Sequence, residues 1–341
     1  MSMKIMNYPI QLSMLDYSNS YFLPIQALRD PAMEFVLNID SLYELLEADS
    51  ETNGLSKTIL FMEEQDRLMN TAEIKEVDGK QQIQISLNFC QFVWTVGLYM
   101  ITYFDNCVQI PFMNAMGCNI HNRKVNPMEI SFANDSFMRA RFMLSRLNRE
   151  SFFEIPNICD PQIFQEVIGH ANGCFHGSLA MLFAHEFSHN LLAHTQHQST
   201  PEQSVEEEKE ADKMAISLLS DALEGDNGYT VKAGIAILMC SLLLLGEDSI
   251  DGGAAHPFMD VRIDYVMNDL DLPQEDQLWG LVGSAIRLWL LVYDGYSIQE
   301  DMQVKTPWNY YKDFYDYYMH KLTEVREKRC APICKQPWDI D

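Results

Sequence analysis

Apolar positions along the chain follow two different periods, and the change of period predicts where strands give way to helices. In residues 73–87, apolar and polar side chains alternate on both sides of Asp78-Gly79, a dipeptide that favours a tight hairpin turn. From about residue 160 onward, apolar residues recur every three or four positions, which is typical of helices with one buried face. The helices predicted there are 174–194, 205–223, 231–245, 258–270, 276–294 and 307–328.

The first third of the chain mixes both kinds of element. Residues 31–50 have the apolar spacing of a helix, and residues 58–63 add a third strand. The aromatic-rich stretch 88–104 fits either a long strand or a buried helix, because its periodicity does not distinguish them. We therefore expect an α+β fold that is mainly helical, with a small antiparallel sheet. The expected division is a mixed α/β region, 1–150, that carries the sheet, and a helical domain, 151–341.

Short signals at the ends of two helices refine these bounds. Ser204 followed by Glu207 resembles a capping box that starts the helix 205–223. Thr306-Pro307 predicts the start of the last helix, with a cap and a first-turn proline. That last helix carries an apolar stripe that we assign to the core: Tyr311, Phe314, Tyr315, Tyr318 and Leu322.

The chain of 341 residues is strongly acidic, with 49 acidic and 24 basic residues and a net charge of −25. Such a field repels a phosphate backbone and an anionic lipid surface, so we expect no nucleic-acid partner. The most apolar run, 231–246, is shorter than the roughly 20 residues that a membrane-spanning helix needs. It predicts a buried helix instead, and no membrane span is expected.

The eight cysteines are scattered along the chain without a CxxC pair, and its start has no apolar stretch typical of a secretory signal. Reduced thiols fit this pattern better than a disulfide framework does. We therefore expect a soluble protein of the cytoplasm.

Three of the nine histidines lie in one short segment, HEFSHNLLAH, residues 185–194. On a helix, His185 and His189 lie one turn apart on the same face, so both imidazoles can bind one cation. Glu186 flanks that cation without binding it and can take a proton from a metal-activated water, as in the HExxH zinc hydrolases. The apolar flanks predict a buried helix, where unpaired imidazoles and a carboxylate would be destabilising. A bound zinc ion would compensate for their burial.

A catalytic zinc site needs a third protein ligand. His194 lies about 140° around the helix from the ligand face, so we predict instead that it interacts with the carboxyl-terminal dipole of the helix. In the next predicted helix, Glu208 and Asp212 share one face. Glu208 is the predicted third ligand, and Asp212 is the predicted acceptor for the outer N–H of a ligating histidine. Glu207 and Glu210 stay open as alternatives for the third ligand.

Three motifs in this order resemble a known group of proteins. HEFSH (185–189), EKEAD (208–212) and HPFMDVR (256–262) are similar to the HExxH, ExxAD and HPxxxxR series of the HtpX and CAAX prenyl protease type. Those proteins are zincin metallopeptidases of the gluzincin class. HEFSHNLLAH also resembles the ImmA/IrrE proteases and the Lit-type phage-exclusion peptidases. The resemblance covers residues 174–270, and the missing membrane helices favour these soluble relatives.

The resemblance implies that one catalytic Zn²⁺ is bound by His185, His189 and Glu208. Glu186 would then be the general base, and Asp212 would lie behind a ligating histidine. His256 and Arg262 would stabilise the oxyanion of the tetrahedral intermediate.

The resulting hypothesis is a soluble zinc-dependent endopeptidase that acts on a protein or peptide substrate. A regulatory protein partner is compatible with this hypothesis. An extended substrate would add as a strand to the edge of the small sheet beside the metal helix. Two alternatives stay open: a non-catalytic binding or regulatory module with a structural zinc, and a zinc amidase that acts on a small substrate. His170 and His176, which precede the HExxH segment, either line the cleft or have a structural role.

Overall fold

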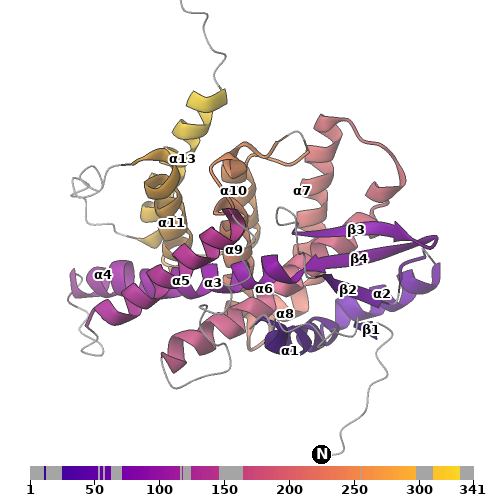
Figure 1. The fold of residues 1–341 in the computed structure, drawn as a ribbon, viewed down its shortest axis with the longest axis horizontal. Coiled ribbons are helices and arrows are strands. Elements are labelled where there is room, and N and C mark those ends of the chain that lie inside the picture. The colour runs from indigo at the N-terminus through magenta and orange to yellow at the C-terminus, as the bar shows by residue number, and fades with distance from the viewer. Residues whose placement is uncertain are drawn as a thin grey trace, which may run out of the picture.

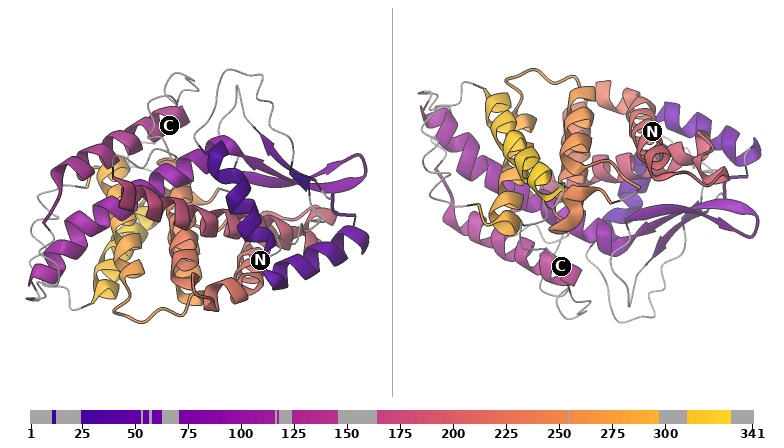
Figure 2. Two further views of the ribbon diagram at one scale, coloured as in Figure 1. Left: turned by 90° about the horizontal axis from the view of Figure 1, so that it is seen from below. Right: turned by 90° about the horizontal axis from the view of Figure 1, so that it is seen from above.

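The computed structural model describes residues 11–12, 25–52, 54–56, 58–62, 71–115, 117, 124–145, 164–253, 255–296 and 310–330. A long helix, α6 (Gln165–Leu191), runs through the middle of the molecule and packs against other helices on several sides (Figure 1). The small sheet lies toward one end of the molecule, while α11 (Gln277–Trp289) and α13 (Tyr311–Cys330) lie toward the other (Figure 2). The predicted class, α+β and mainly helical, is confirmed.

The sheet has the strand order β1-β2-β4-β3, formed by β1 (Gln11–Leu12), β2 (Thr58–Met62), β3 (Ala72–Val77) and β4 (Lys80–Ser86). The predicted hairpin is confirmed: Asp78 and Gly79 join β3 to β4 with φ angles of 52° and 76°. The other two strand pairs are parallel, so the sheet is mixed, and the predicted antiparallel pairing holds only for β3 and β4. The reason is that β4, whose last four residues are buried, lies between β2 and β3 and pairs on both sides.

The aromatic-rich stretch after β4 is a helix, α3 (Leu87–Tyr103). Ser86 caps it, because its hydroxyl accepts a hydrogen bond from Phe89 N at 3.2 Å. The helix is buried on nearly all sides between α6, α5 (Pro127–Ser145) and α9 (Gly228–Leu243), which explains why its sequence is apolar on every face. Its 17 residues exceed the usual length of a strand, and length is the criterion that decides between the two alternatives.

The helix predicted at 31–50 is two helices, α1 (Gln26–Leu37) and α2 (Asp40–Thr52). Asn38 separates them: its side-chain Nδ2 donates to Glu34 O at 2.8 Å, and its backbone leaves the helical region. A side chain that competes in this way for a helix carbonyl is a local signal that the apolar spacing does not contain.

The helix predicted at 205–223 starts earlier, as α7 (Pro201–Leu218). Its cap is Thr200, whose hydroxyl accepts from Gln203 N at 3.3 Å while Gln203 Oε1 accepts from Thr200 N at 2.9 Å. The predicted capping box at Ser204 is therefore wrong, because the proline in the first turn allows the earlier start.

The helix predicted at 205–223 also breaks at Leu219, so that its end forms a separate helix, α8 (Ser220–Glu224). The helix predicted at 174–194 is α6, which begins nine residues earlier and ends at Leu191. The other predicted helices lie close to their expected positions, as α9 (Gly228–Leu243), α10 (Met259–Asp269), α11 (Gln277–Trp289) and α13 (Tyr311–Cys330). Short helical segments of other types are Phe104–Gln109, His194–Gln196, Asp248–Asp251 and Leu290–Asp294, and α4 (Ile110–Ala115) follows the first of them. The predicted apolar stripe of α13 is buried, as expected for core, whereas Thr306-Pro307 lies outside the described residues.

One cluster of buried apolar side chains joins the helices and the sheet, and it includes residues from both of the predicted regions. The boundary predicted near residue 150 lies outside the described residues, so the division into two regions stays a prediction. Over the part of the chain that the structure describes, no helix combines the length and apolar character needed to cross a membrane.

Helices α6 and α9 cross so closely that glycines are required where they touch. A Cβ at Gly177 would lie 2.7 Å from Val231 O, and a Cβ at Gly234 would lie 2.2 Å from Cys174 O. Ser178 Oγ stabilises the crossing by donating to Gly234 O at 2.7 Å. This crossing fixes the position of α6 and therefore of the residues at its carboxyl-terminal end.

We predict that Gly234→Ala lowers the free energy of unfolding by about 1–3 kcal/mol, because the added methyl group must push two packed helices apart. Gly169→Ala is the matched control on α6, since its added Cβ has nothing within 4 Å. The control should be neutral or stabilising by up to about 1 kcal/mol. Urea denaturation followed by circular dichroism measures both variants against the parent chain. Equal stabilities of the two variants would contradict the close crossing.

Candidate metal centre and active site

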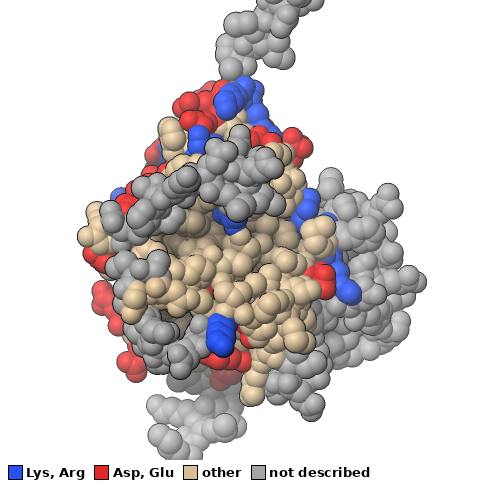
Figure 3. All heavy atoms as spheres, turned by 90° about the vertical axis from the view of Figure 1, so that its left-hand side faces the viewer, with Lys and Arg blue, Asp and Glu red and all other residues tan. Residues whose placement is uncertain are grey.

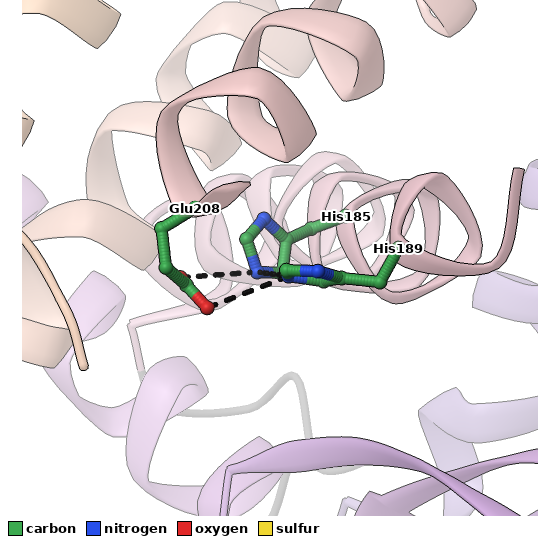
Figure 4. Close-up of side chains that lie close together, drawn as sticks. All are labelled: His185, His189 and Glu208. Atoms are coloured by element: carbon green, nitrogen blue, oxygen red, sulfur yellow. Dashed lines mark hydrogen bonds and ion pairs between the residues drawn. The ribbon is translucent and has the colours of Figure 1, made fainter. Parts of the chain in front are cut away.

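His185 and His189 lie near the carboxyl-terminal end of α6, one helical turn apart, beside α7. Their rings are nearly perpendicular, with centroids 4.7 Å apart and an interplanar angle of 83°. The two Nε2 atoms are 3.2 Å apart and point toward one place, where Glu208 of α7 approaches from the other side (Figure 4).

The carboxylate of Glu208 completes a group of three converging side chains. Its Oε2 lies 3.5 Å from His185 Nε2, and its Oε1 lies 3.4 Å from His189 Nε2. A tetrahedral zinc ion with ligands at about 2.0–2.1 Å would separate its ligand atoms by about 3.3–3.4 Å, so the donor types and their spacing both fit Zn²⁺. Over the described ranges, this is the one group of three or more His, Cys, Asp or Glu residues whose ligand atoms all lie within 4.8 Å of one another.

The neighbours of Glu208 on α7 have other partners. Glu207 Oε1 lies 2.8 Å from His197 Nε2, and Glu210 Oε2 lies 3.3 Å from His194 Nε2. Positions one and two residues away on a helix point in different directions, so Glu208 alone of the three faces the histidine pair. Glu207 and Glu210, the alternatives for the third ligand, therefore lie away from the histidine pair.

Asp212, one turn beyond Glu208, is completely buried in a network of hydrogen bonds. Arg262 of α10 donates to both of its oxygens, from Nε and Nη2, each at 2.8 Å, and Tyr265 donates its hydroxyl at 2.6 Å. Asp212 Oδ1 also lies 2.9 Å from His185 Nδ1, on the side of the ring away from Glu208. Removing one partner from a buried ion pair of this kind typically costs about 3–5 kcal/mol, because the other charge is left unpaired.

Burial disfavours each charge in this network, but the pairings outweigh it. Burial alone would lower the pKa of His185, yet Asp212 and Glu208 raise it to about 10. Burial would raise the pKa of Glu208, but hydrogen bonds from His185 and His189 hold it well below its usual range. Burial acts in the same direction on Asp212, and Arg262 and His185 keep the pKa of that carboxyl low. Both carboxylates are therefore ionised and need positive charge beside them.

Glu186 lines a cavity of about 440 Å³ together with the three converging residues. Burial raises the pKa of Glu186 to about 7; the charge of His185 opposes this rise and that of Glu208 adds to it. Residues 71–74, at the start of β3, form one wall of the cavity, and the carboxyl-terminal end of α9 contributes another. The site thus opens toward an edge of the sheet.

His256 and Arg262, which belong to one motif and share one predicted role, have different surroundings. The His256 side chain is 55% exposed at the cavity, with Nδ1 3.2 Å from Glu208 Oε2. Gly252 permits this placement, because with its φ of 62° a Cβ would lie 2.5 Å from His256 O. Arg262 also lines the cavity, but it is buried, holds Asp212 through two hydrogen bonds, and has Nη1 3.3 Å from Glu208 Oε2.

His194 has partners that the sequence did not predict. α6 ends at Leu191, and Ala193, with a φ of 60°, turns the chain back toward the helix. His194 Nδ1 therefore lies 3.0 Å from His189 Nδ1, and burial followed by the charge of His189 lowers the pKa of His194. The helix therefore ends before the predicted residue 194, while the predicted interaction of His194 with the helix dipole stays a prediction.

A larger cavity, about 900 Å³, lies at the other end of α6, and His170 lines it. Figure 3 views the molecule from the side of α4 and α5 and shows uncharged side chains over the centre of that face. His176 lines neither this cavity nor the smaller one, and its ring stacks on Phe35 with centroids 5.9 Å apart. Neither histidine contributes to the candidate metal centre.

Two residues that support the site were missed in the sequence. Tyr265, which donates to Asp212, follows Arg262 by three residues on α10, so helical spacing could have identified it. Asp49 of α2 accepts a hydrogen bond from Asn190, the residue after His189. No local signal could have identified that pair, because 141 positions separate its members.

Comparison with known proteins bears on the region that contains this site. Residues 83–282 match the family model described as Peptidase U49. The matched region is more than half of the chain and includes all three motifs. No curated protein matches the chain, and no solved structure matches it.

Proposed function

Because the chain belongs to the Peptidase U49 family and is therefore a peptidase, we propose that it is a zinc-dependent endopeptidase that acts at the site between α6 and α7. The observation that carries this proposal is the near-tetrahedral spacing of three donor side chains beside a glutamate in one cavity. His185, His189 and Glu208 would hold one Zn²⁺. Glu186 would be the general base.

Zinc held by these three residues would supply Lewis-acid chemistry: it would polarise the scissile carbonyl and lower the pKa of water toward 7. Glu186 takes the proton from the attacking water and passes it to the nitrogen of the leaving amine, while the water oxygen bonds to the carbonyl carbon and the C–N bond breaks. His256 donates to the carbonyl oxygen as that atom gains negative charge. Arg262 adds positive charge from behind Glu208, and Asp212, with Oδ1 2.9 Å from His185 Nδ1, places a carboxylate beside the outer nitrogen of that ring.

The edge strand β3 is the proposed binding surface for the substrate. Ser86 N donates to Thr71 O, and Ala72 is opposite Ile85, so the strand alternation turns the N–H and C=O of Ala72 and Ile74 away from β4. Both residues line the cavity. A peptide in extended conformation can add to this edge through main-chain hydrogen bonds and lie across the proposed zinc site. This mode of binding favours an unstructured protein segment as the substrate.

We predict that Glu186→Gln abolishes peptide cleavage, with kcat lower by about 10²–10⁴-fold, because the amide cannot accept the water proton. The variant should still bind one Zn²⁺ per chain, since the three ligand side chains are unchanged. Cleavage of a panel of unstructured peptides is followed by mass spectrometry, with and without a zinc chelator, and metal content is measured separately.

Glu166→Gln is the matched control for that experiment, because Glu166 lies at the other end of α6 and lines the other cavity. It should cleave as the parent chain does. Undiminished cleavage by Glu186→Gln would remove the proposed base, and chelator-resistant cleavage by the parent would remove the zinc.

A second prediction concerns the sheet edge. Ala72→Pro removes an outward N–H from β3 without breaking the β3–β4 ladder, and proline is tolerated at the first residue of an edge strand. The loss of one main-chain hydrogen bond to the substrate should lower kcat/KM roughly fivefold. Glu76→Pro removes an equivalent outward N–H beyond the cavity and should leave kcat/KM unchanged. Equal values for the two variants would argue against binding along β3.

A further inference from the structure

We propose that His194 is a positioning residue, which holds the ring of His189 with Nε2 turned toward His185 and Glu208. This inference rests on the proposed zinc site and adds to it a residue that touches neither the metal nor the substrate. It starts from one contact: the Nδ1 atoms of His189 and His194 are 3.0 Å apart, which is hydrogen-bond distance.

The backbone is arranged to make this contact. On a continued helix His194 would lie about 140° around the axis from His189. Ala193 instead adopts left-handed backbone angles, φ 60° and ψ 24°. Glycine and, less often, asparagine or aspartate adopt these angles, but other residues rarely do. The reversal places the His194 ring against that of His189, with centroids 5.1 Å apart and an angle of 68° between them. A rare conformation beside a candidate site is a reason to look for a function of the residue that it places.

The positions of the protons follow from the contacts. A histidine that binds a cation through Nε2 carries its proton on Nδ1, so His189 Nδ1–H is the donor and His194 Nδ1 the acceptor. The proton of a neutral His194 is then on its Nε2, which lies 3.3 Å from Glu210 Oε2. One arrangement of protons therefore satisfies all three residues and leaves His189 Nε2 with a lone pair directed at the metal position.

The other ligating histidine has a comparable contact at its outer nitrogen, with a carboxylate in place of the imidazole. His185 Nε2 faces Glu208, while its Nδ1 lies 2.9 Å from Asp212 Oδ1. Ligating histidines generally donate their outer N–H to such a group, which fixes both the tautomer and the ring orientation. His194 has for His189 the position that Asp212 has for His185. The His194 side chain is only 7% exposed, so water does not compete freely for the contact.

Its position also distinguishes this role from that of a metal ligand. His194 contacts His189 on the Nδ1 edge of the ring, whereas the metal position lies on the Nε2 edge. In the described part of the chain, His194 is not a member of the group whose ligand atoms lie within 4.8 Å of one another.

The test is the affinity of the full chain for Zn²⁺ alone, measured by competition with a chromophoric chelator. His194→Phe keeps a ring in place but removes the acceptor, and should weaken Zn²⁺ binding by about 10–100-fold. His194→Asn places an amide oxygen near the position of Nδ1 and should restore binding to within about threefold of the parent. His197→Phe is the matched control, since His197 is nearby but pairs with Glu207, and it should bind as the parent does.

Parent-like affinity of His194→Phe would overturn the inference. An equal loss in His194→Asn would also overturn it, because ring packing and not the acceptor would then be responsible. If circular dichroism shows that His194→Phe does not fold, His194→Asn and Glu210→Ala take its place. Glu210 is 57% exposed, and its removal should weaken binding about threefold, while unchanged binding would count against the inference. A parent chain that binds no Zn²⁺ would instead overturn the proposed function and this inference together.

Discussion

The site depends on the ion pair between Asp212 and Arg262, which is buried behind the candidate ligands. Its two short hydrogen bonds place a guanidinium 3.3 Å from Glu208, a carboxylate that hydrogen bonds from His185 and His189 keep ionised against the effect of burial. Asp212 in turn keeps one oxygen beside His185 Nδ1 and so orients that ring. One buried pair therefore places positive charge beside Glu208 and a carboxylate beside His185, and it joins α7 and α10 at the site.

Helix packing gives this pair and the histidines a fixed frame. The glycines at the crossing of α6 and α9 let the two backbones touch, and α3 covers α6 as well, so the carboxyl-terminal end of α6 is held in place. α7 and α10 then bring their charged residues to that end, and β3 forms the facing wall of the cavity. The polar groups are concentrated where α6 leaves the core, and the chain reverses at Ala193 just beyond them.

Helical spacing predicted that His185 and His189 meet and that a glutamate of the next helix joins them, but it did not predict how the chain bends between them. His185 and His189 follow from a spacing of four, and the phase of α7 turns Glu208 rather than Glu207 toward them. The strand order, by contrast, depends on β4 lying between β2 and β3, and local sequence patterns do not determine this pairing. The break at Asn38 and the reversal at Ala193 depend on single backbone conformations that apolar periodicity does not encode. The contact between His189 Nδ1 and His194 could therefore not be predicted, although both histidines belong to the motif HEFSHNLLAH.

The most direct measurement of the central claim is anomalous scattering from crystals of the full chain grown with Zn²⁺, recorded on both sides of the zinc absorption edge. The account predicts one strong peak, with His185 Nε2, His189 Nε2 and a Glu208 oxygen about 2.0–2.2 Å from it. A peak coordinated by other residues, or zinc-soaked crystals in which these three side chains surround no peak, would contradict it.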